Sequence, residues 1–126
     1  MLSALDHLVM YVDDLPQAVD FYSRVLDMDA KEQDAGHADL HFGNLTLRLQ
    51  LADSAAEPKA TRPATGGMEL SFASRLPLEE VERHLAALSI PVELGPVARA
   101  GGKGPVESLY LRDPEGNLLE ITRPRR

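Results

Sequence analysis

The chain contains no cysteine and no tryptophan, and aromatic residues make up only 5% of its 126 residues. The absence of cysteine excludes disulfides, zinc–thiolate sites and cysteine nucleophiles. No stretch approaches the roughly 20 apolar residues that a membrane-spanning helix needs. The first ten residues also lack the basic segment and cleavage site of a signal peptide. We therefore expect a cytoplasmic protein with no membrane partner.

Basic residues are scarce as well: 13 Lys and Arg stand against 20 Asp and Glu, for a formal net charge of −7. Nucleic-acid binding needs a basic face for phosphate contacts, so we expect no nucleic-acid partner. Hydrophobic residues (44%) and charged residues (26%) occur at the levels of ordinary globular proteins. Length and composition together predict one domain over residues 1–126.

Two stretches of the chain, residues 5–51 and 67–122, follow the same order of patterns: a strand, a helix, then further strands. Each half has a Leu-Pro step after its first strand, and each enters its last strand through Gly-Asn-Leu, at 43–45 and at 116–118. Residues 52–66, rich in Ala, Pro and Thr, form the linker. The repeat predicts duplication of one βαβββ module.

Helical and strand periods place the elements within each module. Apolar residues recur at helical spacing from about residue 16 to 26 and from about 78 to 89. Strand alternation puts His7 on the face opposite Leu8, and Glu120 on the face opposite Leu119 and Ile121. We predict an α+β fold of two tandem βαβββ modules, in which helices cover one face of each half-sheet and the other faces form a curved, polar cleft.

Several motifs at matching positions resemble the vicinal oxygen chelate superfamily, which includes glyoxalase I, bleomycin-resistance proteins, extradiol dioxygenases and fosfomycin-resistance enzymes. They are Asp6-His7-Leu8, Phe21-Tyr22, and the run from Ser108 and Tyr110 through Asp113-Pro114 and Gly116-Asn117 to Glu120. Glu57-Pro58-Lys59-Ala60, with Gly-Pro-Val at 95–97 and 104–106, is similar to glyoxalase-domain-containing proteins near the fosfomycin-type enzymes. The resemblance covers nearly the whole chain.

The resemblance implies a metal site with ligands from the first and last strands of the modules. Residue by residue, it assigns His7, Glu69 and Glu120 as ligands, although many members carry histidine where Glu69 stands. Counting four residues from the glycine of each Gly-Asn-Leu matches Glu120 with Leu47. Glyoxalase I has a carboxylate at that fourth position, so the four-ligand pattern is broken here.

One imidazole and two carboxylates suit a divalent ion such as Mn²⁺, Fe²⁺ or Mg²⁺, with Zn²⁺ and Ni²⁺ also possible. Three protein ligands leave coordination positions open for substrate oxygens. Without a metal, two facing carboxylates would repel, and we expect the apparent pKa of such a pair to rise. The other interpretation is a hydrogen-bonded structural His7 with Glu69 and Glu120 exposed to solvent.

Alternation places further polar side chains on the cleft faces. The predicted substrate-binding residues are Arg48, Gln50, Ser108, Tyr110 and Arg112. Arg48 and Tyr110 suit an anionic group such as a carboxylate or phosphonate; alternatively they are a surface arginine and a half-buried tyrosine. No residue is assigned a catalytic role.

The sequence thus predicts a divalent-metal-dependent enzyme of the lyase, isomerase, dioxygenase or antibiotic-resistance type, acting on a small oxygen-rich molecule. A metal-free protein that sequesters a drug or metabolite is the alternative, and a duplicated scaffold with a vestigial site is a third reading. The resemblance also implies a homodimer, whose modules pair either within one chain or across the two chains.

Overall fold

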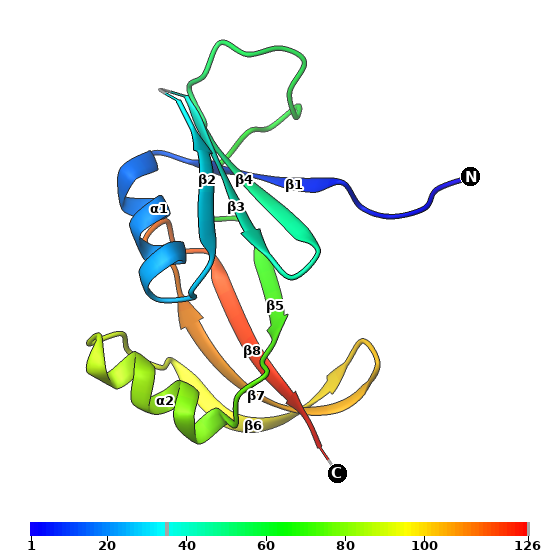
Figure 1. The fold of residues 1–126 in the computed structure, drawn as a ribbon, viewed down its shortest axis with the longest axis vertical. Coiled ribbons are helices and arrows are strands. Elements are labelled where there is room, and N and C mark those ends of the chain that lie inside the picture. The colour runs from blue at the N-terminus through cyan, green and yellow to red at the C-terminus, as the bar shows by residue number, and fades with distance from the viewer. Residues whose placement is uncertain (35, 126) are drawn as a thin grey trace. The chain divides into compact units, whose positions relative to one another are not determined.

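The computed structural model describes residues 1–34 and 36–125, which form two compact units (Figure 1). Unit 1 comprises Met1–Gly67 with Pro114–Gly116, and unit 2 comprises Met68–Asp113 with Asn117–Arg126. Each unit holds one four-stranded sheet and one helix. The predicted α+β class and βαβββ repeat are confirmed. Neither α-helix of the described chain is long and apolar enough to cross a membrane.

Unit 1 contains β1 (His7–Val12), α1 (Leu15–Arg24), β2 (Asp29–Gln33), β3 (His37–Phe42) and β4 (Leu45–Leu51). Its strands lie in the order β1-β4-β3-β2, with β1 parallel to β4 and the other pairs antiparallel. The Asp14 carboxylate caps α1 by accepting a hydrogen bond from the Gln17 amide at 3.0 Å. The helix then buries Ala18, Phe21 and Tyr22 beside its sheet.

Unit 2 contains β5 (Glu69–Ala73), α2 (Leu78–Ala87), β6 (Leu94–Gly101), β7 (Gly104–Arg112) and β8 (Leu118–Pro124). Its order, β5-β8-β7-β6, repeats that of unit 1, again with one parallel pair, β5 and β8. The N-cap position of α2 is Pro77, which forms no side-chain cap hydrogen bond. Leu78, Val81 and Leu85 are the buried residues of this helix.

Each sheet has one apolar and one polar face, because side chains alternate along every strand. Leu47 and Leu49 in β4, and Leu109 and Leu111 in β7, have at most 1% of their surface exposed and belong to the core. The intervening residues form the polar faces. The unit 1 polar face carries His7, Val9, Tyr11, His37, Asp39, His41, Thr46, Arg48 and Gln50. The unit 2 polar face carries Glu69, Ser71, Ala73, Ser108, Tyr110, Arg112, Leu118, Glu120 and Thr122.

The register of the parallel pairs identifies the counterparts within the repeat. Two residues into β1, Val9 pairs with Arg48; two residues into β5, Ser71 pairs with Glu120. When β1 and β5 are matched from their first residues, Arg48 is therefore the counterpart of Glu120.

The prediction that Leu47 is the counterpart of Glu120 is wrong. Leu47 lies on the apolar face and has only 1% of its surface exposed. The error comes from where the parallel pairing begins. His7 pairs with Thr46, three residues after Gly43, whereas Glu69 pairs with Leu118, two residues after Gly116. Counting from the glycine therefore gives a position that is displaced by one residue.

Candidate functional site

His7 begins β1 and contacts a charged residue through each ring nitrogen. Its Nδ1 lies 2.8 Å from Oδ2 of Asp6, and its Nε2 lies 3.5 Å from Nη1 of Arg48. Because a guanidinium only donates, we assign the ring hydrogen to Nδ1 and a lone pair to Nε2. A carboxylate on one nitrogen and a lone pair on the other is the usual arrangement of a metal-binding histidine. The nearby Arg48, however, already brings positive charge to Nε2.

Arg48 itself is held by Asp39 on the neighbouring strand β3. Its Nε donates to Oδ1 at 2.7 Å and its Nη2 to Oδ2 at 3.0 Å, which makes a bidentate pair. Asp39 has only 4% of its surface exposed. The hydrogen bond from Arg48 outweighs the effect of burial and lowers the pKa of Asp39 below its usual value. Arg48 is thus fixed on the unit 1 polar face, where its fork already binds one carboxylate.

Gln50, the other predicted substrate-binding residue of unit 1, pairs in register with His37 and Tyr11 on the two flanking strands. The Tyr11 hydroxyl accepts a hydrogen bond from the Ala60 amide at 3.1 Å. Gln50 therefore lies two residues along β4 from Arg48, on the same face. This placement agrees with the alternation in the sequence, while its binding role stays a prediction.

In unit 2, Glu120 lies on β8 directly opposite Tyr110 on β7. The Tyr110 hydroxyl donates to Oε2 of Glu120 at 3.0 Å. Burial alone would raise the pKa of Glu120, but the hydroxyls of Ser108, Ser71 and Tyr110 and the charge of Arg99 outweigh it and lower that pKa. The expected rise is therefore wrong for Glu120: hydroxyl donors stabilise its anion, so this carboxylate is charged at neutral pH.

Ser108 lies on the same face and has no exposed surface. Among the described residues its hydroxyl has no hydrogen-bond partner at good geometry. It still lies near enough to the Glu120 carboxylate to favour the charged form. Ser108 thus contributes to the polarity around Glu120, as alternation predicted, and its role toward a substrate stays a prediction.

Sequence reasoning missed Arg99. Its Nε donates to the Tyr110 hydroxyl at 3.2 Å, and its guanidinium carbon lies 5.5 Å from the centre of the Tyr110 ring. Leu94 pairs with Tyr110 on the unit 2 polar face, so unbroken alternation would point Arg99 to the opposite face. A register shift in β6 between Leu94 and Val97 brings Arg99 to the polar face instead. The only signal in the sequence is a cation next to the glycine-rich turn at 101–104.

Arg112, a predicted substrate-binding residue, forms a bidentate ion pair with Glu93, and its role toward a substrate stays a prediction. Its Nε and Nη2 donate to the two carboxylate oxygens of Glu93 at 3.0 and 3.2 Å. That contact, with a smaller contribution from the charge of Glu69, raises the pKa of Arg112. Glu69 is exposed at the start of β5, two register positions from Glu120 along the parallel pair. A guanidinium is therefore also near Glu69.

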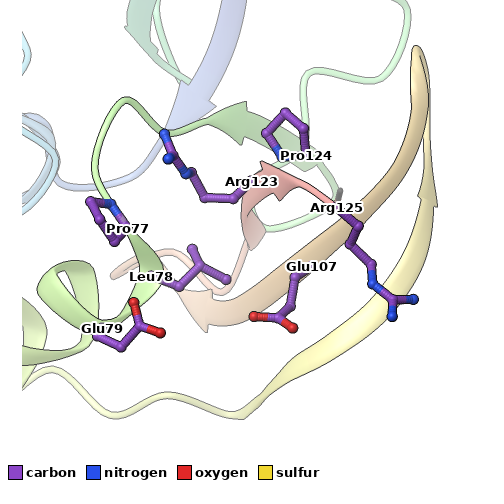
Figure 2. Close-up of a pocket in the computed structure, with 7 residues that line it drawn as sticks. All are labelled: Pro77, Leu78, Glu79, Glu107, Arg123, Pro124 and Arg125. Atoms are coloured by element: carbon purple, nitrogen blue, oxygen red, sulfur yellow. The ribbon is translucent and has the colours of Figure 1, made fainter.

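A separate pocket of about 320 Å³ in unit 2 is lined by the start of α2, by Glu107 of β7 and by the end of β8 (Figure 2). Glu107 turns its carboxylate toward the start of α2, and Arg123 donates to the Ser74 carbonyl at 3.2 Å. Glu107 alternates with Ser108 and so points away from the unit 2 polar face. The predicted site residues do not line this pocket.

The structure thus brings His7 together with Arg48, and Glu120 together with Tyr110 and Ser108. No group of three or more His, Asp and Glu side chains is placed to hold a metal within residues 1–34 and 36–125. His7 belongs to unit 1 and the two glutamates belong to unit 2. The ligand set of His7, Glu69 and Glu120 stays a prediction.

Sequence comparison finds close relatives over almost the whole chain. Virulence protein STM3117 of Salmonella typhimurium is 35% identical over 122 residues, which are 97% of this chain and 85% of that protein. Glyoxalase domain-containing protein RDO1 of Mycosarcoma maydis is 37% identical over 119 residues, which are 94% of this chain and 67% of that protein.

Solved structures share the fold. An integron cassette protein from the mobile metagenome of V. cholerae gives a TM-score of 0.92 at 36% identity, over 99% of this chain and 98% of that chain. Lactoylglutathione lyase from Agrobacterium tumefaciens gives 0.77 at 26% identity, over 98% and 95%. The fosfomycin resistance protein FosX from Listeria monocytogenes, at 18% identity and a TM-score of 0.71 over 99% and 96%, shares the fold alone.

A family model matches residues 4–121, nearly the whole chain. This agrees with the sequence motifs, with the two βαβββ units and with relatives more than 30% identical. The chain belongs to the Glyoxalase/Bleomycin resistance protein/Dioxygenase superfamily.

Proposed function

We propose that the chain is a divalent-metal-dependent enzyme that acts on a small oxygen-rich molecule, with His7, Glu69 and Glu120 as metal ligands. Its superfamily includes metal-dependent enzymes such as glyoxalases and fosfomycin-resistance proteins. The observation that carries the proposal is the contact of the His7 ring with Asp6. The Asp6 carboxylate lies 2.8 Å from Nδ1, as in metal-binding histidines whose other ring nitrogen binds the ion.

The donor set fits a divalent ion. The Asp6 carboxylate on Nδ1 of His7 leaves the Nε2 lone pair as the donor. Two carboxylates beside one imidazole suit manganese, iron, nickel, zinc or magnesium. Such an ion, when bound, would act as a Lewis acid on oxygens of the substrate.

The chain's own residues would bind and orient the substrate. Gln50, Ser108 and Tyr110 offer hydrogen-bond donors and acceptors on the two polar faces. Arg48 and Arg112, which Asp39 and Glu93 hold in place, would contribute their positive charge. This favours a substrate with an anionic group.

We further propose a homodimer, which light scattering of the purified protein would test.

Metal analysis and calorimetry test the proposal. The purified parent should contain a divalent metal, and after removal of that metal it should bind Mn²⁺, Fe²⁺, Ni²⁺ or Zn²⁺ in titrations. His7→Ala, Glu69→Gln and Glu120→Gln should each weaken binding at least tenfold, because each removes a ligand. Glu107→Gln is the matched control, since Glu107 points away from the unit 2 polar face. A parent that binds none of these ions would overturn the proposal.

A metal-free binding protein that sequesters a small molecule is the second candidate, and two ionic contacts favour it. Nη1 of Arg48 lies 3.5 Å from Nε2 of His7, and the charge of Glu69 acts on Arg112. Because the charge of Arg99 also acts on Glu120, side-chain cations already supply positive charge to each of the three proposed ligands. If the chain is a metal-free binding protein, calorimetry should detect no metal binding. Added Mn²⁺ should then leave small-molecule binding to Glu69→Gln unchanged.

A further inference from the structure

Three side chains on neighbouring strands of unit 2 form a hydrogen-bonded chain. Arg99 on β6 donates through Nε to the Tyr110 hydroxyl on β7 at 3.2 Å. Tyr110 in turn donates to Oε2 of Glu120 on β8 at 3.0 Å. Tyr110 and Glu120 are direct partners across β7 and β8. The hydrogen-bonded series therefore crosses three adjacent strands of the sheet, β6, β7 and β8.

The order of donors in this hydrogen-bonded series fixes where the phenol hydrogen of Tyr110 points. A tyrosine hydroxyl has one hydrogen to donate, and a guanidinium has no acceptor. Arg99 therefore occupies the acceptor side of the Tyr110 oxygen, which directs the phenol hydrogen to Glu120. The stacking of the guanidinium over the ring, at 5.5 Å from its centre, adds a second contact that limits motion of the ring.

Arg99 is anchored at its other end as well. Its Nη1 donates to its own strand at the Ala98 carbonyl, at 3.1 Å. The guanidinium is thus held at the backbone of β6 and at Tyr110. Arg99 itself precedes the turn at 101–104, which joins β6 to β7 (Figure 1). A long side chain that would otherwise sample many rotamers has two fixed contacts.

We infer that Arg99 is a positioning residue: it acts through Tyr110 to hold the Glu120 carboxylate in one orientation, ready to bind a metal ion. The inference rests on the proposed function in so far as Glu120 is a metal ligand. Arg99 itself contacts neither metal nor substrate in this role. Partners that orient a ligand in this way typically change metal affinity by about 10- to 100-fold when they are removed.

The test is Mn²⁺ titration calorimetry on the parent and on Arg99→Met, Arg99→Lys, Tyr110→Phe and the double variant Arg99→Met/Tyr110→Phe. Arg99→Met should weaken Mn²⁺ binding about tenfold. Arg99→Lys should recover part of that loss, because an ammonium also donates to the phenol oxygen. The double variant should bind no more weakly than Tyr110→Phe alone, because Arg99 acts only through Tyr110.

Lys103→Met is the matched control, since it removes one positive charge from the turn of the same hairpin. It should bind Mn²⁺ like the parent. Equal weakening by Lys103→Met and Arg99→Met would show that only net charge matters, and fully additive losses in the double variant would show that Arg99 acts independently of Tyr110. Either result overturns the inference.

Crystal structures of the metal-free parent and of Arg99→Met separate this inference from the proposed function. Glu120 should keep one side-chain orientation in the parent and adopt others in the variant. If the parent binds no Mn²⁺ but Glu120 reorients in the variant, the proposed function fails and the positioning role stands. If Glu120 keeps its orientation in Arg99→Met, the inference is wrong whether or not metal binds.

Discussion

Arg48 in β4 and Glu120 in β8 hold the same register position in two units of identical strand order, yet they carry opposite charges. The repeat therefore offers a carboxylate at this position in unit 2 and a guanidinium in unit 1. Arg48 is also fixed there by the bidentate contact with Asp39. A cation held in this way cannot coordinate a metal ion, so the four-ligand pattern of glyoxalase I is broken by Arg48.

The first prediction concerns that missing carboxylate. We expect negligible isomerisation of the glutathione–methylglyoxal adduct by the parent, whichever divalent metal is added, because Arg48 supplies no fourth ligand. The measurement is thioester formation in the presence of Mn²⁺, Ni²⁺ or Zn²⁺, with an authentic glyoxalase I as the positive control. Turnover on the order of 10 per second, the level of an ordinary enzyme, would show that the proposed assignment of the metal ligands is wrong.

A second prediction follows from the buried carboxylate of Asp39. Asp39→Asn should lower the free energy of unfolding by about 2 kcal/mol, because it replaces a charge-assisted bidentate contact and leaves the Arg48 guanidinium without its counterion. Urea denaturation measures the change. Asp20→Asn is the control: Asp20 forms an exposed ion pair with Arg24 on α1, which should contribute less than about 1 kcal/mol. Equal effects of the two substitutions would contradict the argument.

The pH dependence of stability gives a third prediction. The pKa of Asp39 is lowered in the folded state, so near its unfolded value of about 3.9 the folded protein binds fewer protons than the unfolded chain. The stabilisation from Asp39 is therefore fully present above about pH 4 and is lost as the pH falls through the folded pKa. In this pH range the free energy of unfolding should depend less on pH in Asp39→Asn than in the parent. An equal pH dependence in the two proteins would contradict the assigned contact.

The sequence predicted the parts of this fold that depend on local periods. Alternation correctly placed His7, Arg48, Tyr110 and Glu120 on polar faces, because each lies in a strand with regular pairing. The repeat also predicted the shared βαβββ order, since each half carries the same succession of periods.

What the sequence did not predict depends on where strand pairing begins and where it is irregular. Leu47 was matched with Glu120 because β4 begins to pair with β1 three residues after Gly43, whereas β8 begins to pair with β5 two residues after Gly116. Arg99 lies beyond a register shift in β6, where alternation no longer applies. The partner of Arg48 is Asp39 on another strand, and only the register of β3 against β4 reveals that pair.

A fourth prediction concerns the start of α1. Asp14→Ala should destabilise the protein by about 1 kcal/mol, because the Gln17 amide loses the carboxylate that caps it. Thermal and urea melting measure the loss, and Asp14→Ser should restore most of it. Pro77→Ala at the start of α2 removes no side-chain cap and serves as the comparison. An Asp14→Ala variant as stable as the parent would show that the cap contributes nothing.

The last prediction links metal binding to stability. Mn²⁺ at a hundred times its dissociation constant should stabilise the parent by about 2.7 kcal/mol, because the ion binds only the folded state. The gain should shrink or vanish in Glu69→Gln and Glu120→Gln and persist in Glu107→Gln, whose side chain points away from the unit 2 polar face. Thermal melts with and without Mn²⁺ measure it.

The metal-free melts of the same variants add a test of the contacts around Glu120. Repulsion between two carboxylates would make Glu120→Gln at least as stable as the parent without metal. The structure predicts the opposite, because the Tyr110 hydroxyl donates to this carboxylate and its pKa is lowered. Glu120→Gln should therefore melt below the parent in the absence of metal, while Glu69→Gln, exposed at the start of β5, should melt close to it. A Glu120→Gln variant that gains stability without metal would show that repulsion outweighs the hydroxyl donors.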